Sequence, residues 1–385
     1  MDDKEIRKIL IEILYTVINE AESSPILIQK ITEDNLVSVY RLAKKHDLAH
    51  IVSNYVYQNK ITVEKAELRA KLQKEEMMSV YRNEQMKYTF EQICDIFDEA
   101  NIPYVPLKGS VIRPYYPYEN MRTSCDIDIL IHEENLEAAI SCLENTGYRC
   151  GDKNYHDVSL YSPNKIHLEL HFNIQENMDS LDNVLKDAWN YASLVKGSRY
   201  EFNKNFFVFY MYAHMAYHFL SGGCGVRSLL DIWVMEHKMN APYSCAEDLL
   251  KKAGIYEFAS EMSNISNKCF SFNERDEFSD LILEYICDGG IYGSKENNIA
   301  IYKSKDKSSF NYLMERLFLP YKCMIVSYPI LKKAPYLLPF CWVVRWMKAI
   351  FDNKLNKFTF EMSKAKKIPD QTIREIKEIR SRLGL

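Results

Sequence analysis

Glycine and proline are scarce in this chain of 385 residues, with only 12 of each. Their usual shares are about 7% and 5%. The shortage excludes collagen-like and low-complexity sequence, argues against a glycine-rich dinucleotide loop, and favours long helices. A basic excess is also missing, because 49 Lys and Arg stand against 53 Asp and Glu, a formal charge of −4. Long nucleic acid is therefore a poor candidate partner, since binding a phosphate backbone needs positive charge.

Paired cysteines and targeting segments are absent as well. The ten cysteines are scattered, without a CxxC pair or a Cys/His cluster at zinc spacing, which predicts free thiols. The N-terminal MDDKEIRKIL alternates acids and bases, unlike a signal peptide. Residues 205–226 carry no Asp, Glu, Lys or Arg, but their apolar part would form a helix of only ~22 Å, short of a ~30 Å hydrocarbon core. We expect a buried core helix there and a cytoplasmic protein.

The hydrophobic periodicity divides the chain into three regions. Residues 1–95 have helical periodicity, with helices expected over 4–20, 36–57 and 63–100. Residues 96–178 contain short β-rich segments, and one helix from about Asn135 that Gly147 ends. Residues 179–385 return to helical periodicity. The predicted fold class is α+β, with a small mixed-sheet core embedded between N-terminal and C-terminal helical regions. The strands are expected near 103–110 and over 125–131, 155–161 and 166–172.

The most informative segment is CDIDILI, residues 125–131. On a strand, Asp126 and Asp128 point to the same face, because side chains alternate with a period of two. Like charges at this spacing repel, and a divalent cation would compensate them. A solvated edge strand with its acids facing water is the alternative that this pattern alone leaves open.

Two neighbouring motifs favour the cation. In HLELH, Glu169 shares a strand face with His167 and His171, which makes a third carboxylate available beside possible metal-supporting or acceptor-lining histidines. Upstream, Gly109 and Ser110 leave a predicted strand and enter a helix, where backbone N–H groups can meet a phosphate. Three acids and such a turn are typical of two-metal phosphoryl transfer.

These motifs resemble the nucleotidyltransferase superfamily with the DNA polymerase β type core, whose signature is hG[GS] followed by Dh[DE]h and a later third acid. More narrowly, LKG, CDIDILI, HLELHFNI and GVRSLLDIW resemble a bacterial family of uncharacterised nucleotidyltransferases over about residues 100–240. The resemblance implies a phosphate turn at Gly109 and Ser110, metal ligands at Asp126 and Asp128, and the third acid at Glu169.

Basic side chains flank these motifs. Lys108 and Arg122 are expected to neutralise a triphosphate, Lys as a point charge and Arg through its bidentate fork. Arg113 is more simply explained as surface charge. Arg227 lies four residues before Asp231, so a helix ion pair is one interpretation. The family resemblance implies instead that Arg227 faces the nucleotide.

His214 and His218 lie one turn apart on the apolar helix. No third ligand accompanies them in an HExxH-like pattern, so we expect core or pocket histidines, not a metal site.

Residues 334–351, within PYLLPFCWVVRWMKAIFDNK, combine aromatic and basic residues. Peripheral membrane contact or a partner protein is possible here. Core packing is favoured, because aromatic stripes on helices usually face protein. The residues concerned are Trp342, Trp346 and Phe351, with Arg345 and Lys348 between them.

The sequence thus favours a Mg²⁺-dependent or Mn²⁺-dependent nucleotidyltransferase. Its expected reaction moves a nucleoside monophosphate from a nucleoside triphosphate, with ATP favoured by resemblance only, to a hydroxyl of an unknown small molecule, peptide or protein, and releases pyrophosphate. A tRNA terminus remains a possible acceptor. The alternatives are a non-catalytic, antitoxin-like binding module of the same fold and a kinase-like phosphotransferase.

Overall fold

The computed structural model describes most of the chain. The described residues are 2–176, 178–271, 276–290, 293–305, 314–315, 317–351 and 368–385.

A seven-stranded mixed sheet lies at the centre of the fold, in the order β3-β4-β5-β2-β1-β7-β6. β2 and β5 pair in parallel, β1 pairs antiparallel with β2, and β1 continues in parallel with β7. The strands are β1 (Tyr104–Pro106), β2 (Asp126–Ile131), β3 (Arg149–Lys153), β4 (Asp157–Tyr161), β5 (His167–His171), β6 (Ala192–Lys196) and β7 (Arg199–Phe202). The predicted mixed-sheet α+β fold class is confirmed.

The two faces of the central strands differ in chemistry. Ile127 and Ile129 of β2 and Leu168 and Leu170 of β5 are buried in one apolar cluster with residues of the helices α5 (Ala66–Glu99) and α7 (Leu136–Asn145). Because strand side chains alternate, Asp126, Asp128 and Glu169 face the other way. The apolar face therefore fixes the direction in which the acids point.

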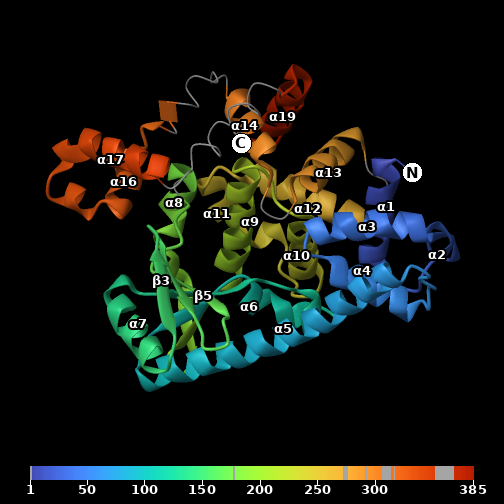
Figure 1. The fold of residues 1–385 in the computed structure, drawn as a ribbon, viewed down its shortest axis with the longest axis horizontal. Coiled ribbons are helices and arrows are strands. Elements are labelled where there is room, and N and C mark those ends of the chain that lie inside the picture. Colours follow the sequence, from blue (N-terminus) through green and yellow to red (C-terminus); the bar gives the residue numbers. More distant parts are fainter. Residues whose placement is uncertain are drawn as a thin grey trace.

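The polar face of the sheet is covered by helices from the C-terminal half. The helices α9 (Lys204–Leu220) and α10 (Val226–His237) line a cavity over this face, and their apolar residues share one core with α1 (Asp3–Ile18), α2 (Pro25–Lys30), α3 (Glu33–Lys45), α4 (Ala49–Gln58) and α12 (Tyr256–Phe270). In Figure 1, α5 runs beneath both the sheet and the N-terminal helices. The N-terminal and C-terminal helices thus pack into a common core beside the sheet.

The remaining helices have the following bounds. They are α6 (Gly109–Ile112), α8 (Asp179–Leu185), α11 (Glu247–Lys252), α13 (Glu277–Gly289), α14 (Lys295–Ser304), α16 (Tyr321–Ser327), α17 (Leu338–Phe351) and α19 (Asp370–Arg382).

The helix predicted over 36–57 is wrong as a single element. It is two helices, α3 and α4, because the chain turns at Asp47, whose φ is +57°. The helix before Gly147 ends as predicted, and Gly147 adopts a φ of +93°, which suits a residue without Cβ. β3, β6 and β7 were not predicted, since they are exposed or half-buried and lack the apolar alternation that marks a strand. The region boundaries at 95 and 178 remain predictions.

The uncharged stretch after Asn205 is the buried helix α9, as predicted. Phe206, Phe209 and Phe219 are almost completely inaccessible to solvent. In the described part of the chain, no helix combines the length and the apolar character that crossing a membrane requires.

Residues 317–351 form a small helical lobe with its own apolar cluster. The indole N–H groups of Trp342 and Trp346 donate hydrogen bonds of 2.9 Å to the carbonyls of Leu319 and Leu317. Trp342 packs half-buried against this cluster, as core packing predicts, whereas Trp346 is half-buried beside the ring of Phe318. The side chain of Phe351 lies outside the described residues.

The buried face of β5 gives a direct test of this packing. Leu170→Ala should lower the free energy of unfolding by about 2–5 kcal/mol, because Leu170 is fully buried against α5 and α7. Leu194→Ala on the exposed strand β6 is the control, with an expected change within about 0.5 kcal/mol. Urea denaturation measures both, and equal effects would contradict the assignment of the core face.

Candidate active site

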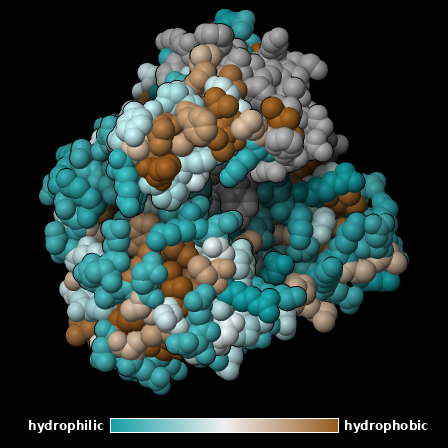
Figure 2. Space-filling view, turned by 60° about the vertical axis from the view of Figure 1, so that its left-hand side comes forward, coloured by the Kyte–Doolittle hydropathy of each residue, from teal (hydrophilic) through white to brown (hydrophobic). Residues whose placement is uncertain are grey.

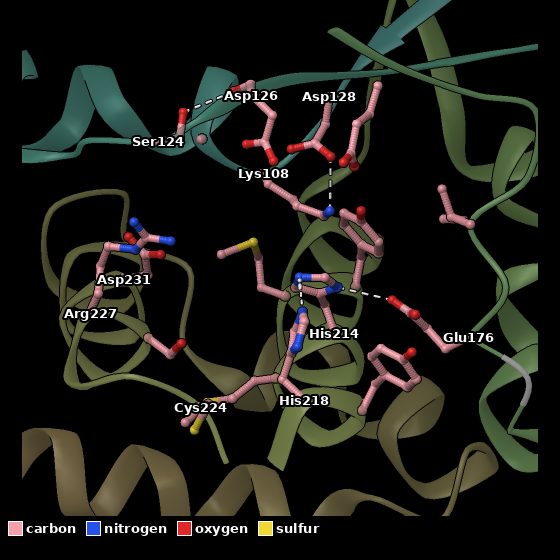
Figure 3. A pocket seen from close by; sticks show the side chains of 18 of the residues that line it. Lys108, Ser124, Asp126, Asp128, Glu176, His214, His218, Cys224, Arg227 and Asp231 are labelled. Atoms are coloured by element: carbon pink, nitrogen blue, oxygen red, sulfur yellow. Dashed lines mark hydrogen bonds and ion pairs between the residues drawn. The ribbon is translucent and has the colours of Figure 1, made fainter. Parts of the chain in front are cut away.

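The carboxylates of β2 and β5 meet on the polar face of the sheet. The parallel register places Asp128 opposite Glu169 and Asp126 opposite His167. All three acids line a cavity of about 350 Å³ between the sheet and the helices α9 and α10. Figure 3 shows Asp126 and Asp128 pointing from β2 into this cavity, with His214, His218 and Glu176 on its opposite side. The shared face predicted from sequence is therefore present.

Asp128 is the most enclosed of these acids. It accepts a hydrogen bond of 2.9 Å from Lys108 Nζ, and His171 Nε2 lies 3.0 Å from the same oxygen, Oδ1. Burial alone would favour the protonated carboxyl, but Lys108 and His171 outweigh it and hold the pKa of Asp128 well below its usual range. Asp128 is thus a buried carboxylate that keeps its charge.

Asp126 and Glu169 lack such a close cation. Burial, together with the charge of Asp128, raises the pKa of Asp126. Burial and the two aspartates raise the pKa of Glu169 to about 8. Both shifts express the cost of placing several carboxylates in one enclosed space. A cation bound among these acids would reduce the repulsion between their carboxylates and favour the ionised form of each.

The donor atoms in this cluster suit a divalent cation. Ligand atoms of Asp128, Glu169 and His171 all lie within 4.8 Å of one another, and so do those of Asp126, His167 and Glu169. The His171 atom that faces the acids is Nε2, which lies 3.0 Å from Asp128 Oδ1 and 3.6 Å from Glu169 Oε2. Carboxylate oxygens suit Mg²⁺ and Mn²⁺, whereas imidazole is more typical of Zn, Cu, Fe and Ni, so the three carboxylates carry the fit. The residues present therefore fit the metal that the family resemblance implies.

His171 and His167 occupy different positions around the acids. His171 contacts Asp128 directly and lies 3.6 Å from Glu169 Oε2. His167 lies farther out, with Nδ1 4.0 Å from Glu169 Oε1 and its ring stacked on Tyr161. The structure thus brings His171 into the cluster and leaves His167 at its rim.

The residues at the start of α6 line two different cavities: Lys108 and Gly109 line the acidic one, and Ser110 lines another. Lys108 has a φ of +44° and directs its ammonium group to Asp128, which raises the pKa of Lys108 well above the usual value despite its burial. Gly109 lines the same cavity. Ser110 instead lines a second cavity of about 360 Å³, together with Tyr104 and Arg113. Only part of the predicted phosphate turn therefore faces the acids.

Arg122 is part of a buried cluster at the cavity wall. Its Nε donates a 2.7 Å hydrogen bond to Asp231 Oδ1, which also accepts a 2.6 Å bond from the Tyr116 hydroxyl. The Arg122 charge is thereby balanced inside the protein. Arg113 is not the surface charge that the sequence suggested, because it donates 3.0 Å hydrogen bonds to the carbonyl of Arg122 and to Ser124 Oγ. Both arginines hold the segment that leads into β2.

Arg227 does not pair with Asp231, the helix ion pair that its spacing allowed. Arg227 Nη1 contacts Asp47 at 2.9 Å and the carbonyl of Thr123 at 3.1 Å. Asp47 also accepts a 2.7 Å hydrogen bond from the Thr123 hydroxyl. Arg227 lines the cavity at the same time, so it joins the α3–α4 turn to the cavity wall near the acids.

A chain of three polar residues crosses the wall opposite the acids. His214 Nδ1 lies 2.9 Å from Glu176 Oε1, and His214 Nε2 lies 3.0 Å from His218 Nε2. Burial lowers the pKa of His214 well below 6.5, and burial with the neighbouring His214 lowers that of His218 to about 3, so both rings are neutral near pH 7. They are pocket histidines, as the sequence favoured. We call this set the Glu176–His214–His218 chain.

Sequence reasoning missed several residues of this site. Glu176 follows β5 in a loop without periodicity, and Tyr210 is one of many aromatic residues on α9. Asp47 lies in a turn between two helices that the sequence joined into one. The proximity of an acid to a histidine 38 residues away could not be read from spacing.

Comparison with known proteins agrees with this geometry. No curated protein and no solved structure matches the chain. Residues 32–270, more than half of the chain, match the family described as uncharacterised nucleotidyltransferases. The matched region includes β1, β2, β5, α9 and α10, and therefore every residue that lines the acidic cavity. On this match, the chain belongs to the uncharacterised nucleotidyltransferase family.

Proposed function

We propose that this protein transfers a nucleoside monophosphate from a nucleoside triphosphate, with ATP as the favoured donor, to a hydroxyl group of a small molecule, peptide or protein. The observation that carries the proposal is the convergence of Asp126, Asp128 and Glu169 from two parallel strands in one cavity. Membership of a nucleotidyltransferase family supports it.

The donor side of the cavity is assigned to the wall nearest β2. When bound, Mg²⁺ or Mn²⁺ held by Asp126, Asp128 and Glu169 would stabilise charge on the triphosphate as a Lewis acid. Lys108 and Arg227 both line this part of the cavity and carry positive charge toward phosphate oxygens. Gly109 lines the same cavity, where its backbone is assigned to the phosphate groups. Arg122 acts through its neighbours, because it is buried and its hydrogen bonds go to Asp231 and the carbonyl of Thr123.

The acceptor side is assigned to Glu169 and the opposite wall. The acceptor oxygen attacks the α-phosphorus, its proton passes to the Glu169 carboxylate, and the bond from the α-phosphorus to the bridging oxygen breaks to release pyrophosphate. With no cation bound, a pKa of about 8 keeps Glu169 largely protonated near neutral pH; a metal cation held beside it would favour its carboxylate, the form that accepts the proton. His171, between Glu169 and Asp128, keeps the two carboxylates oriented.

The Glu176–His214–His218 chain supplies a hydrogen-bond acceptor on that wall. Burial raises the pKa of Glu176, and the orientation that we propose has its carboxylate accept a hydrogen bond from His214 Nδ1–H, which leaves His214 Nε2 to accept from His218 Nε2–H. Nδ1 of His218 then keeps its lone pair. We propose that this lone pair accepts a hydrogen bond from a hydroxyl or an amide N–H of the acceptor molecule.

Labelled ATP tests the reaction and the role of the aspartates. Incubated with Mg²⁺ and a cell extract, the protein should transfer label from α-³²P-ATP to an acceptor and release pyrophosphate. Asp126→Asn and Asp128→Asn should lower this labelling at least ~10²-fold, because each removes a metal-binding carboxylate. Asp152→Asn, on the exposed strand β3, is the matched control and should retain full activity.

Three results would contradict this proposal. Transfer from γ-³²P-ATP with release of ADP would favour the kinase-like alternative. Absence of metal and triphosphate binding in calorimetry would favour the non-catalytic module. Full labelling by folded Asp126→Asn would remove the carboxylate cluster from the mechanism.

Glu169→Gln should separate chemistry from nucleotide binding. Glutamine is nearly isosteric but cannot take up the acceptor proton, so labelling should fall by at least ~10²-fold. The calorimetric Kd for the metal–nucleotide complex should change much less than turnover. A large loss of affinity with little loss of turnover would move Glu169 to the donor side.

His218→Leu tests the acceptor wall. Removing the polar atoms should lower labelling about 10-fold at low extract concentration, with partial recovery at high concentration, while nucleotide affinity stays unchanged. His218→Asn should restore part of the activity, because its amide oxygen can also accept a hydrogen bond. Equal activity of the Leu and wild-type proteins would exclude this role.

A further inference from the structure

An apolar stripe on α17 faces solvent. We call the residues Tyr336, Phe340, Val343, Met347 and Ile350 the α17 stripe; their exposed fractions lie between 44% and 81%. None of them lines the acidic cavity. The stripe is therefore a feature of the surface, independent of the proposed reaction.

The spacing of the stripe places it on one side of the helix. The four members on α17, Phe340, Val343, Met347 and Ile350, are three, four and three residues apart, which at 3.6 residues per turn keeps them on one face; Tyr336 lies in the short 3-10 helix Pro335–Leu337 directly before α17. The other face of α17 packs inward, where Cys341 is buried and the indoles of Trp342 and Trp346 bond to the backbone before α16. The helix thus has an apolar outer face in addition to the one that folds the lobe.

The segment that carries the stripe has charge of one sign. Residues 319–351 contain no Asp or Glu and five basic residues, Lys322, Lys332, Lys333, Arg345 and Lys348, in a chain whose formal charge is −4. Lys332, Lys333 and Lys348 are exposed. The short helix Pro329–Lys332 packs against the segment Pro335–Leu337, which leads into α17, so these lysines lie close to the start of the stripe. Figure 2 shows brown and tan residues gathered on the upper part of the molecule.

We propose that the α17 stripe docks on the surface of a membrane that contains anionic lipids. A helix with an apolar face flanked by lysines lies in the headgroup region, with its apolar side chains in the upper part of the acyl layer. The phenol ring of Tyr336 suits this boundary, where tyrosine is enriched. The 14 residues of α17 span ~21 Å, which is too short to cross a ~30 Å hydrocarbon core, so the helix rests on the membrane.

The lysines beside the stripe argue against a partner protein or a second copy of this chain as its occupant. Lysine is depleted in protein–protein interfaces, whereas it attracts anionic headgroups. A second copy that docked through the same segment, 319–351, would bring five more basic residues and no acid. Lipid headgroups supply the negative charge that this segment lacks.

Vesicle sedimentation with the full chain tests the proposal. The protein should partition onto vesicles of phosphatidylcholine with 30% phosphatidylglycerol, and at least ~10-fold less onto phosphatidylcholine alone, because each lysine near an anionic surface contributes about fivefold. Added salt should weaken the binding, since it screens surface charge.

Two pairs of substitutions locate the contact. Phe340→Glu with Met347→Glu should lower the partition coefficient at least ~10-fold, and Lys332→Gln with Lys333→Gln should lower it by a similar factor. Met77→Glu with Val80→Glu on α5 is the control, because Met77 and Val80 are also exposed apolar residues and the charge change is the same. Circular dichroism confirms that each variant is folded.

Three outcomes would overturn the proposal: no partition onto anionic vesicles, an equal loss in the α5 control, or concentration-dependent dimers that the Phe340 and Met347 substitutions abolish. The last would assign the stripe to self-association. Labelling from α-³²P-ATP in solution should be unaffected by the stripe variants, so failure here is distinct from failure of the proposed reaction.

Discussion

A buried carboxylate stays ionised only when nearby positive charge or hydrogen-bond donors offset its lost hydration. Asp128 is such a buried carboxylate, and the arrangement of the cavity follows from how it is balanced. Lys108 and His171 meet it with hydrogen bonds to one oxygen of Asp128. Both partners occupy defined places: Lys108 sits in a turn with positive φ, and His171 ends the neighbouring parallel strand. The remaining acids, Asp126 and Glu169, then share a space in which the nearest cation is already engaged. Their raised pKa values follow from this arrangement.

The sequence predicted the acidic face because alternation is a local property. Asp126 and Asp128 point together on any strand, and Leu168 and Leu170 fix the direction of Glu169 in the same way. The partners of the arginines were not predictable, since they depend on tertiary contacts. Arg227 has an acid one turn away on its own helix, yet it pairs with Asp47, which is 180 residues distant. Asp231 is left to Arg122 and Tyr116, which anchor α10 to the segment before β2.

The same limit explains the errors in secondary structure. The apolar pattern of 36–57 continues through Asp47, so periodicity joined two helices that a single left-handed residue separates. That break has a consequence for the site, because the turn exposes the Asp47 carboxylate to Thr123 and Arg227. The strands β6 and β7 were not predicted because they lack an apolar pattern. Their side chains are partly or wholly exposed, so neither strand needs the alternating apolar residues that a buried face requires.

The cavity has two walls of different electrostatic character, and this difference gives the proposed reaction a direction. On the sheet side, Asp126, Asp128 and Glu169 concentrate negative charge next to Lys108. On the helix side, His214 and His218 are neutral, because α9 is apolar around most of its circumference and burial lowers their pKa values. A highly charged triphosphate gains most beside cations held by the acids, whereas a neutral hydroxyl-bearing molecule loses little solvation against the histidines. Glu169 belongs to the sheet side, so in the proposed reaction the acceptor hydroxyl reaches its carboxylate from the histidine side of the cavity.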